Sequence, residues 1–267
     1  GRAEARKRLR RSTGLTEHTF MNADPDISLI FVNYRSVRYL AKALESLFSF
    51  EQERSRFEVI VVNNDPSESK GLEILRQSFP FLLLESGGNI GFGSGNNRGT
   101  AVARGDILGF INPDVLWIGT YLPQIGSLFS QEKRIGVLGM ELLTESKHPE
   151  AWSVGMEPSI FRLVRNNLFP AKQAFWKKTG LSFPDWVSGG ALFIRAEIFS
   201  EIGGFDERFF LYFEDVDLCS EVRKRGFAIA YDPALPLIHL GGKSKHSRAL
   251  QKKHFYDSQQ KYFDKRR

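Results

Sequence analysis

An aromatic run followed by clustered acids is the part of this sequence best suited to chemistry. The run occupies residues 205–213, and Glu214, Asp215 and Asp217 follow it. Burying carboxylates beside aromatic side chains costs free energy unless the acids are solvated, paired or used in a reaction. An ionised carboxylate at the edge of a pocket can act as a general base. Helix capping is the alternative, because acids in a first helical turn each contribute about 0.3–1 kcal/mol.

The glycines around this segment predict a helix that begins near Glu214 and ends at Gly226. Asp215 would then share one face with apolar residues at helical spacing, and Glu214 would lie on another face with Asp217. The apolar residues are Leu218, Cys219 and Val222. We therefore expect Asp215 to point inward as the base, with its ionised form favoured by the helix macrodipole.

Polar residues follow three predicted strands at the point where each strand ends. The strands cover residues 27–32, 57–62 and 107–111, and segments with helical spacing lie between them. The polar groups are Asn33-Tyr34, Asn63-Asn64-Asp65 and Asn112-Pro113-Asp114. Alternating strands and helices predict a doubly wound parallel sheet, in which ligands bind beyond the carboxyl ends of the strands. The polar groups therefore predict a binding site at that edge.

A glycine-rich loop over residues 87–95 opens a predicted helix. The order Gly91-Phe92-Gly93-Ser94-Gly95-Asn96 lacks the third glycine of a dinucleotide fingerprint, and it follows a later strand than the first. Glycines before a helix still allow backbone N–H groups to approach an anion closely. A plain turn capped by asparagine is the alternative.

The second half of the chain is less regular. Residues 144–182 have no clear period, which is typical of a lid or an acceptor-binding wall. A strand over residues 186–194 contains Gly189-Gly190, which indicates close approach of the backbone to a ligand. Short strands are also predicted over 227–231 and 237–239.

Composition and charge limit the class of protein. The chain has 267 residues, and its net charge of +6 is concentrated at both ends. The mildly acidic body is unlike a duplex-binding surface, so we expect no nucleic acid partner. The single Cys219 fits a reducing, cytoplasmic compartment. Residues 1–25 are expected to be a disordered basic leader. Residues 247–267 are expected to form a basic helix, either solvated or against the anionic inner face of the cell membrane.

These motifs, with Gly105-Asp106, Trp186 and His239, occur in an order that resembles inverting family 2 glycosyltransferases of the GT-A fold. The branch they resemble is the rhamnosyltransferase-like one, over residues 26–246. The resemblance implies an α/β fold with a Rossmann-like, mostly parallel sheet flanked by helices and an irregular acceptor-side half. It implies a nucleotide-sugar-binding half over 26–114 and an acceptor-binding, catalytic half over 115–246.

The resemblance also implies roles for individual residues. The nucleotide-sugar would contact Asn33, Tyr34, Asn63, Asp65, Gly91, Gly93, Asn96, Asn97 and Asn112. The acceptor or transferred sugar would contact Trp186, Ser188, Gly189 and Gly190. Asp215 would deprotonate the acceptor hydroxyl, and Glu214 would position the acceptor. Asn63 departs from the family's usual aspartate, so Asp65 is an alternative reader of the pyrimidine ring.

Asn112-Pro113-Asp114 resembles the family's Asp-x-Asp motif with asparagine in the first position. By that resemblance Asp114 would bind a divalent cation, Mg²⁺ or Mn²⁺, that neutralises charge on the departing nucleoside diphosphate. His239 would contact the cation or the diphosphate, and Lys243 and His246 could reach the phosphates. A Pro turn for Asp114 and a structural role for His239 are the alternatives.

The resemblance favours transfer of L-rhamnose from dTDP-L-rhamnose to a cell-surface polysaccharide or a lipid-linked glycan. UDP-linked galactofuranose, glucose or N-acetylhexosamine are alternative donors. A catalytically silent nucleotide-sugar-binding module is an alternative of another class. Nucleotidyl transfer is disfavoured, because Asn33-Tyr34-Arg35-Ser36 stands where its Gly/Lys/Arg-rich loop would follow the first strand.

Overall fold

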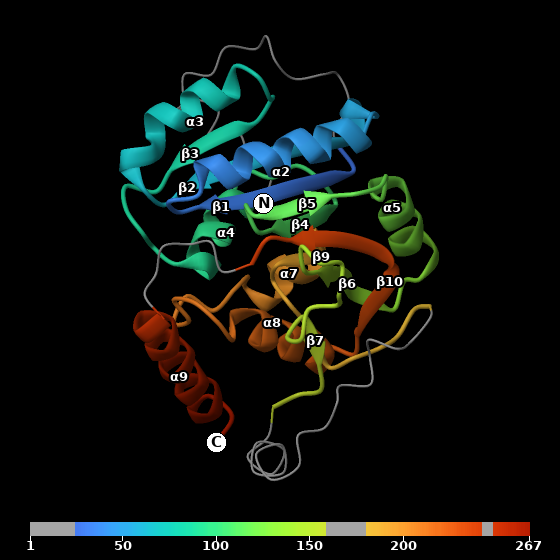
Figure 1. Ribbon diagram of the computed structural model, residues 1–267. Coiled ribbons are helices and arrows are strands. Elements are labelled where there is room, and N and C mark those ends of the chain that lie inside the picture. The colour runs from blue at the N-terminus through green and yellow to red at the C-terminus, as the bar shows by residue number, and fades with distance from the viewer. Residues whose placement is uncertain (1–24, 159–179, 242–247) are drawn as a thin grey trace.

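The computed structural model describes residues 25–158, 180–241 and 248–267 (Figure 1). Apart from residue 25, the predicted leader lies outside these ranges, as do Lys243 and His246. The main strands are β1 (Ile27–Asn33), β2 (Phe57–Asn63), β3 (Leu82–Glu85), β4 (Ile107–Ile111), β5 (Val115–Trp117), β6 (Ile135–Leu143), β9 (Ala191–Arg195) and β10 (Ala228–His239). A short ribbon pairs β7 (Val154–Gly155) with β8 (Trp186–Val187).

The helices are α2 (Val37–Phe50), α3 (Ser69–Arg76), α4 (Phe92–Thr100), α5 (Leu122–Gln131), α7 (Ala196–Ile202), α8 (Glu214–Lys224) and α9 (Arg248–Asp264). Two 3₁₀ turns, η2 (Arg54–Arg56) and η3 (Pro66–Glu68), flank β2. Across the three described ranges, none of the helices has the length and apolar character needed to span a bilayer.

One eight-stranded sheet has the order β3-β2-β1-β4-β9-β6-β10-β5. The strands β3, β2, β1 and β4 run parallel, which confirms the sheet predicted for the first half. In the second half β9 runs antiparallel between β4 and β6, and β5 runs antiparallel to β10. The chain order reverses at β1, so the ends of β1, β2 and β4 open onto the ligand-binding edge of this architecture.

Two predictions of strand boundaries were wrong. The segment predicted as one strand over 186–194 divides into β8 and β9 at residues 188–190. The strands predicted over 227–231 and 237–239 are one long strand, β10, whose pairing with β6 shifts register between Asp232 and Pro236. This bulged strand carries His239 to the sheet edge beside β5.

Side-chain alternation along the central strands fills both faces of the sheet. Leu29 and Phe31 of β1 belong to the core that contains α2 and α5, and Ile30 belongs to the core that contains α7 and α8. Burial on both faces explains the continuous apolar sequence of β1. A third, smaller cluster joins Tyr262 of α9 to the aromatic segment before α8.

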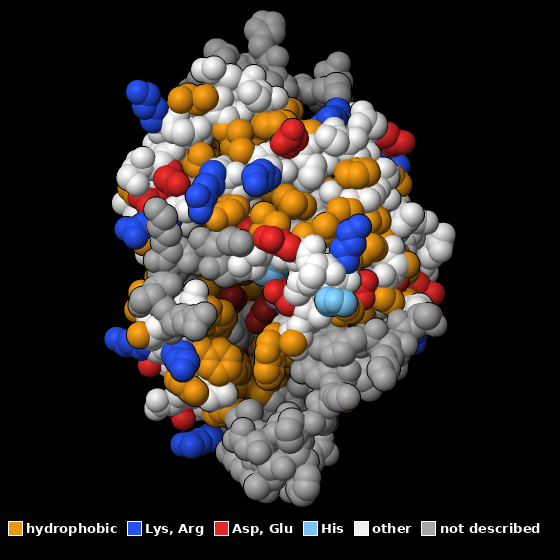
Figure 2. Space-filling model, viewed as in Figure 1, with side chains coloured by type: hydrophobic (Ala, Val, Ile, Leu, Met, Phe, Trp, Pro, Cys, Tyr) orange, Lys and Arg blue, Asp and Glu red, His pale blue; other side chains and the backbone are white. Residues whose placement is uncertain are grey.

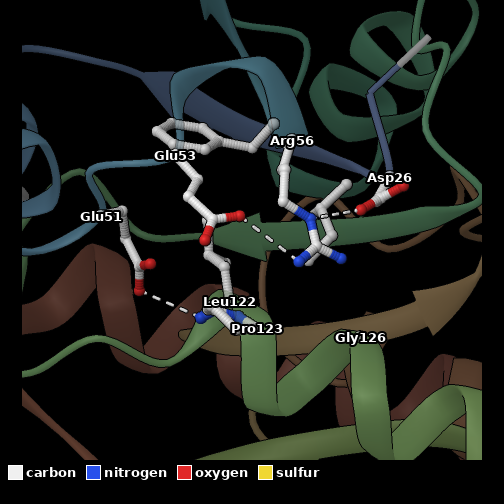
Figure 3. Close-up of a pocket in the computed structure, with 9 residues that line it drawn as sticks. Asp26, Glu51, Glu53, Arg56, Leu122, Pro123 and Gly126 are labelled. Atoms are coloured by element: carbon white, nitrogen blue, oxygen red, sulfur yellow. Dashed lines mark hydrogen bonds and ion pairs between the residues drawn. The ribbon is translucent and has the colours of Figure 1, made fainter. Parts of the chain in front are cut away.

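A small cavity of about 20 Å³ lies at the opposite edge of the sheet, near the amino ends of β1 and β2 (Figure 3). The buried Glu51 beside it accepts hydrogen bonds from the Trp117 indole at 3.2 Å and from the Tyr121 and Leu122 amides at 2.6 and 3.0 Å. This carboxylate satisfies N–H groups at the start of α5. The cavity is therefore a structural feature, remote from the carboxyl ends of the strands.

Candidate active site

Asp114 and His239 meet where the turn after β4 lies beside the end of β10. Val115 pairs with His239, and the Leu240 amide donates to the Asp114 carbonyl at 2.9 Å. These contacts bring His239 Nε2 within 3.3 Å of Asp114 Oδ1. On the other side of the ring, Nδ1 lies 2.8 Å from Glu150 Oε2. The sequence analysis missed Glu150, which lies in an irregular segment without motif or period.

The two carboxylates control the charge of His239. Burial lowers the pKa of His239, but Asp114 and Glu150 outweigh this effect and raise that pKa to about 10. A divalent cation fits the same position, since carboxylate oxygen and imidazole nitrogen are ordinary ligands and Glu150 would hold Nδ1–H. Within the described residues the structure shows no group of three or more potential ligand side chains.

A glycine pair connects this position with the acids of α8. The Asn112 amide donates to the Gly190 carbonyl at 2.9 Å, and the Gly189 amide donates to Asp215 Oδ2 at 2.8 Å. Added side chains would make tight contacts here, because a Cβ at Gly190 would lie 2.8 Å from Leu142 Cδ1 and one at Gly189 3.2 Å from Phe92 Cε1, so these neighbours would have to shift. The backbone of this pair therefore lies directly against a candidate catalytic carboxylate, and the predicted close approach to a ligand stays a prediction.

Burial of the two acids differs from the prediction. Asp215 is half-buried, whereas Glu214 is 5% exposed and its Oε2 has no hydrogen-bond partner among the described groups. Burial raises the pKa of Glu214 well above its ordinary value, and the charge of Asp215 adds to the rise. Burial also raises the pKa of Asp215, although the Gly189 and Val216 N–H groups oppose that rise. The Gly189 and Val216 N–H groups therefore favour the ionised form of Asp215, whereas burial and the charge of Asp215 favour the protonated form of Glu214.

The donor-side asparagines form a buried network instead of facing open space. Asn63 is 0% exposed, and its amide oxygen accepts from Asn33 Nδ2 and the Asp65 amide, both at 3.1 Å. Its amide nitrogen donates to Ser69 Oγ at 3.1 Å and Glu85 Oε2 at 2.9 Å. Every hydrogen-bonding position of the Asn63 amide is thus used inside the protein. Asp65 Oδ1 likewise accepts from the Ser67 amide and hydroxyl, and its Oδ2 accepts from Arg35 Nε, so the reading of a base by either residue stays a prediction.

The glycine-rich loop docks against the acidic segment. The Phe92 amide donates to the Phe210 carbonyl at 3.0 Å, and a Cβ at Gly91 would lie only 2.7 Å from that oxygen. A Cβ at Gly93 would meet Phe205 Cβ at 3.1 Å and Glu214 Cβ at 3.8 Å. The loop and the acids therefore form one wall.

Of the remaining predicted residues, Asn96 and Asn97 belong to α4, beside this wall, and Tyr34 lies at the end of β1. Asn97 holds the backbone of Phe205, accepting from its amide and donating to its carbonyl, both at 2.9 Å. Asn97 is thus an anchor for the aromatic segment. Asn96 is buried and donates to the Phe92 carbonyl at 3.1 Å. Tyr34 is half-buried at the end of β1.

Trp186 begins β8, and Ser188 directly follows that strand. Trp186 is half-buried, and its indole N–H donates to the Met156 carbonyl at 3.0 Å. Ser188 Oγ accepts from the Gly190 amide at 3.1 Å and so supports the glycine pair. Figure 2 shows a hollow near the centre of the face in view, with acidic and histidine side chains in its depth and hydrophobic side chains along one side.

The sequence is similar to known glycosyltransferases over most of its length. Residues 25–255 match the family described as "Glycosyltransferase like family 2". The N-acetylglucosaminyl-diphospho-decaprenol L-rhamnosyltransferase of Mycobacterium tuberculosis is 27% identical over 238 residues, which cover 80% of this chain and 75% of that protein. Rhamnosyltransferase WbbL of Escherichia coli is 28% identical over 231 residues, which cover 80% of this chain and 83% of the relative.

The fold is shared with solved glycosyltransferases. A mannosyltransferase from Pyrobaculum calidifontis, solved with GDP-Man and Mn²⁺, has a TM-score of 0.58 at 14% sequence identity. The match covers 91% of this chain and 66% of the archaeal chain, slightly under two thirds. The chain is therefore a glycosyltransferase of family 2, in the rhamnosyltransferase-like branch, with the GT-A fold.

Proposed function

We propose that this glycosyltransferase transfers L-rhamnose from dTDP-L-rhamnose to a cell-surface polysaccharide or lipid-linked glycan, with inversion at the anomeric carbon. The rhamnosyltransferase names of two relatives support the donor sugar. The diphospho-decaprenol in one of those names supports an acceptor carried on a lipid diphosphate. A UDP-sugar on the same scaffold is the competing donor.

The observation that carries the proposal is the hydrogen-bonded path from Asn112 through the glycine pair to Asp215. This path holds a carboxylate base and the Asp114–His239 pair on adjoining elements. Asp215 would take the proton from the acceptor hydroxyl as that oxygen bonds to the anomeric carbon. The bond from that carbon to the diphosphate oxygen would break on the opposite face, which inverts the configuration.

Asp114 and His239 are the residues that would hold a divalent cation, Mg²⁺ or Mn²⁺. When bound, the cation would supply positive charge next to the diphosphate. Glu150 would fix the His239 ring so that Nε2 faces the cation. Asp65 would line the nucleotide side with the buried Asn33 in the network behind it, and the half-buried Trp186 would offer a flat face to a sugar.

The basic C-terminal segment is the part of the chain that could contact a membrane surface. Lys261, Lys265 and Arg266 donate to protein groups, so these residues are not available to a membrane surface. Lys252 and Lys253 are exposed and could contact an anionic lipid headgroup. We propose a cytoplasmic enzyme with peripheral membrane contact.

A donor panel tests the function. The enzyme would be mixed with Mn²⁺, a lipid-diphosphate glycan acceptor and dTDP-rhamnose or one of several UDP-sugars, and the product would be analysed by NMR. Rhamnose transfer with inverted anomeric configuration is the expected result. Transfer from a UDP-sugar alone would replace the donor, and retained configuration would exclude direct displacement. Nucleotide binding without turnover of any donor would favour a silent binding module.

A further inference from the structure

Two consecutive residues before the acids have an uncommon backbone conformation. Tyr212 and Phe213 have φ angles of 69° and 68°, in the left-handed region that side-chain-bearing residues rarely adopt. Phe213 is the residue immediately before α8, so its backbone sets the direction in which Glu214 and Asp215 leave. Such a conformation persists only where surrounding contacts hold it.

The contacts that hold this turn come largely from one face of α9. That face repeats at helical spacing through His254, Ser258, Lys261 and Tyr262, and the turn that directly follows α9 adds Lys265 and Arg266. Ser258 Oγ donates to the Leu211 carbonyl at 2.9 Å, directly before the turn. The Phe213 ring lies 5.4 Å from the Tyr262 ring, between ring centroids. The turn is thus fixed by both its backbone and its aromatic side chain.

The end of α9 holds the first turn of α8 by charge. Lys265 Nζ lies 2.8 Å from Asp217 Oδ2, and Arg266 donates to Asp217 Oδ1 at 3.0 Å. Lys265 also contacts Asp206 Oδ2 at 2.9 Å, so one ammonium joins both ends of the aromatic segment. Asp217 is 2% exposed and lies two residues after Asp215. A buried carboxylate without these partners would be strongly disfavoured.

We propose that α9 is a clamp that positions the base, with Ser258, Lys265 and Arg266 as positioning residues for Asp215. This inference rests on the proposed role of Asp215 as the base. The donor-side groups are held by other elements: Asp65 by η3, and Asp114 by the β5–β10 pairing. Loosening the clamp should therefore slow the chemical step and leave donor binding unchanged.

The test uses Lys265→Met with Arg266→Met in the full chain. We expect kcat to fall by about 10- to 100-fold, because misplacing a reacting group by about 1 Å has effects of this size. The donor KM and the melting shift caused by dTDP with Mn²⁺ should stay at wild-type values. Lys265→Arg with Arg266→Lys should restore most of kcat. Lys70→Met with Lys133→Met removes the same charge from exposed positions outside α9 and should leave kcat unchanged.

Hydrogen exchange provides a readout that does not depend on turnover. Amides of residues 209–217 should exchange faster in the methionine variant, while those of β1 and β2 stay protected. Wild-type kcat in the folded variant, or equal loss of kcat and nucleotide binding, would overturn the clamp. If the double variant does not fold, Ser258→Ala is judged by the same criteria. Failure of the wild type to transfer any sugar would instead refute the proposed function, and unchanged exchange at 209–217 would refute the clamp.

Discussion

The pair Glu214 and Asp215 gives neighbouring carboxyl groups different protonation states. Glu214 is the more deeply buried, and its Oε2 has no hydrogen-bond partner in the described part of the chain. Asp215 accepts the Gly189 amide at 2.8 Å and the Val216 amide at 2.8 Å. The charge of Asp215 raises the pKa of Glu214, and the two N–H donors favour the ionised form of Asp215.

Replacing Asp215 should separate catalysis from binding. Asp215→Asn keeps the shape and removes the base, so kcat should fall by about 10²–10⁴-fold while nucleotide binding persists. Glu214→Gln should lose much less, because burial and the charge of Asp215 raise the pKa of Glu214 and so disfavour its ionised form. In the wild type, the acidic limb of kcat/KM should lie above the ordinary aspartate pKa of about 3.9, since burial raises the pKa of Asp215. Full activity of Asp215→Asn would remove Asp215 as the base.

Glu150 should act on metal affinity through His239. Glu150→Gln leaves the Asp114 side chain in place but weakens the partner of His239 Nδ1. Removal of such an orienting group typically costs about 10–100-fold in metal affinity. The measurement is a Mn²⁺ titration of the dTDP-dependent melting shift, with Glu45→Gln on the exposed side of α2 as control. An unchanged Mn²⁺ midpoint in Glu150→Gln would contradict this role.

Residue types could be predicted from the sequence, but their hydrogen-bond partners could not. The motif positions led to Asp114, His239 and Asp215, which the fold brings onto adjoining elements. Asn63 and Asn97 fit the same motif equally well, yet their amides are used inside the protein. A side-chain amide can serve a ligand or its own backbone, and only three-dimensional neighbours decide between these uses.

At the scale of elements, the glycines of α4 allow the helix to lie directly on the sheet. A Cβ at Gly99 would lie 2.6 Å from Ile30 Cγ2 and 3.2 Å from Val62 Cγ2. This close approach brings the glycine-rich loop to the ends of β1 and β2.

Two alanine substitutions should therefore have opposite effects on stability. Gly99→Ala should destabilise the protein by about 1–3 kcal/mol, because overpacking outweighs helix propensity. Gly126→Ala in α5 has nothing within 4 Å of the added Cβ and should stabilise by about 0.5–1 kcal/mol. Denaturant unfolding measures both. Destabilisation of similar size in both variants would show that packing on β1 and β2 is not the cause.

The α9 contacts also predict how stability depends on pH. Arg208, together with Lys265, lowers the pKa of Asp206 below its ordinary value. A lowered pKa in the folded state gives stability that is present above the unfolded pKa of about 3.9 and is lost as the pH falls toward the folded pKa. Asp206→Asn should therefore cost about 1.5–3 kcal/mol at pH 7. The difference from wild type should shrink progressively below about pH 4.

The control for this prediction is Asp264→Asn. Asp264 is half-exposed and faces the exposed Arg267 at 3.5 Å, so its loss should cost about 0–1 kcal/mol. Urea unfolding between pH 3 and pH 7 provides the measurement. A pH-independent effect of Asp206→Asn would show that the lost contact is not ionic.

The packing role of α9 could not be predicted from apolar periodicity. Its inward face carries His254, Ser258, Lys261, Lys265 and Arg266, which resemble a solvated or membrane-facing surface when read alone. The partners are the acids Asp206 and Asp217 and backbone carbonyls more than 40 residues earlier in the chain. By contrast, β1 and β2 were predictable because a strand buried on both faces is apolar throughout.

At the scale of the whole molecule, the sheet brings together site residues from distant parts of the chain. The three polar strand ends could be predicted to converge, since parallel strands present their carboxyl ends at one edge. The antiparallel strands β5 and β9, together with β10, complete the site, because they bring His239 to Asp114 and Gly189 to Asp215. No local pattern encodes these pairings, which depend on long-range register.

Occupancy of this site should be measurable at Cys219, the single cysteine of the chain. Cys219 is 0% exposed in the core beneath α8, and burial raises the pKa of its thiol. A thiol reagent should therefore react only when α8 opens or the protein unfolds. A ligand that binds only the closed protein suppresses such opening by the factor 1 + [L]/Kd, about 100-fold at 100 times Kd.

We therefore expect dTDP with Mn²⁺ to slow labelling of Cys219 by about that factor under near-native conditions. Asp114→Ala should remove most of this protection, because the cation would lose its carboxylate, whereas Asp215→Asn should keep it. The rate is followed by mass spectrometry against nucleotide concentration. Equal labelling with and without nucleotide would mean that α8 opens independently of the donor site. Protection that survives Asp114→Ala would mean that nucleotide binding does not depend on Asp114.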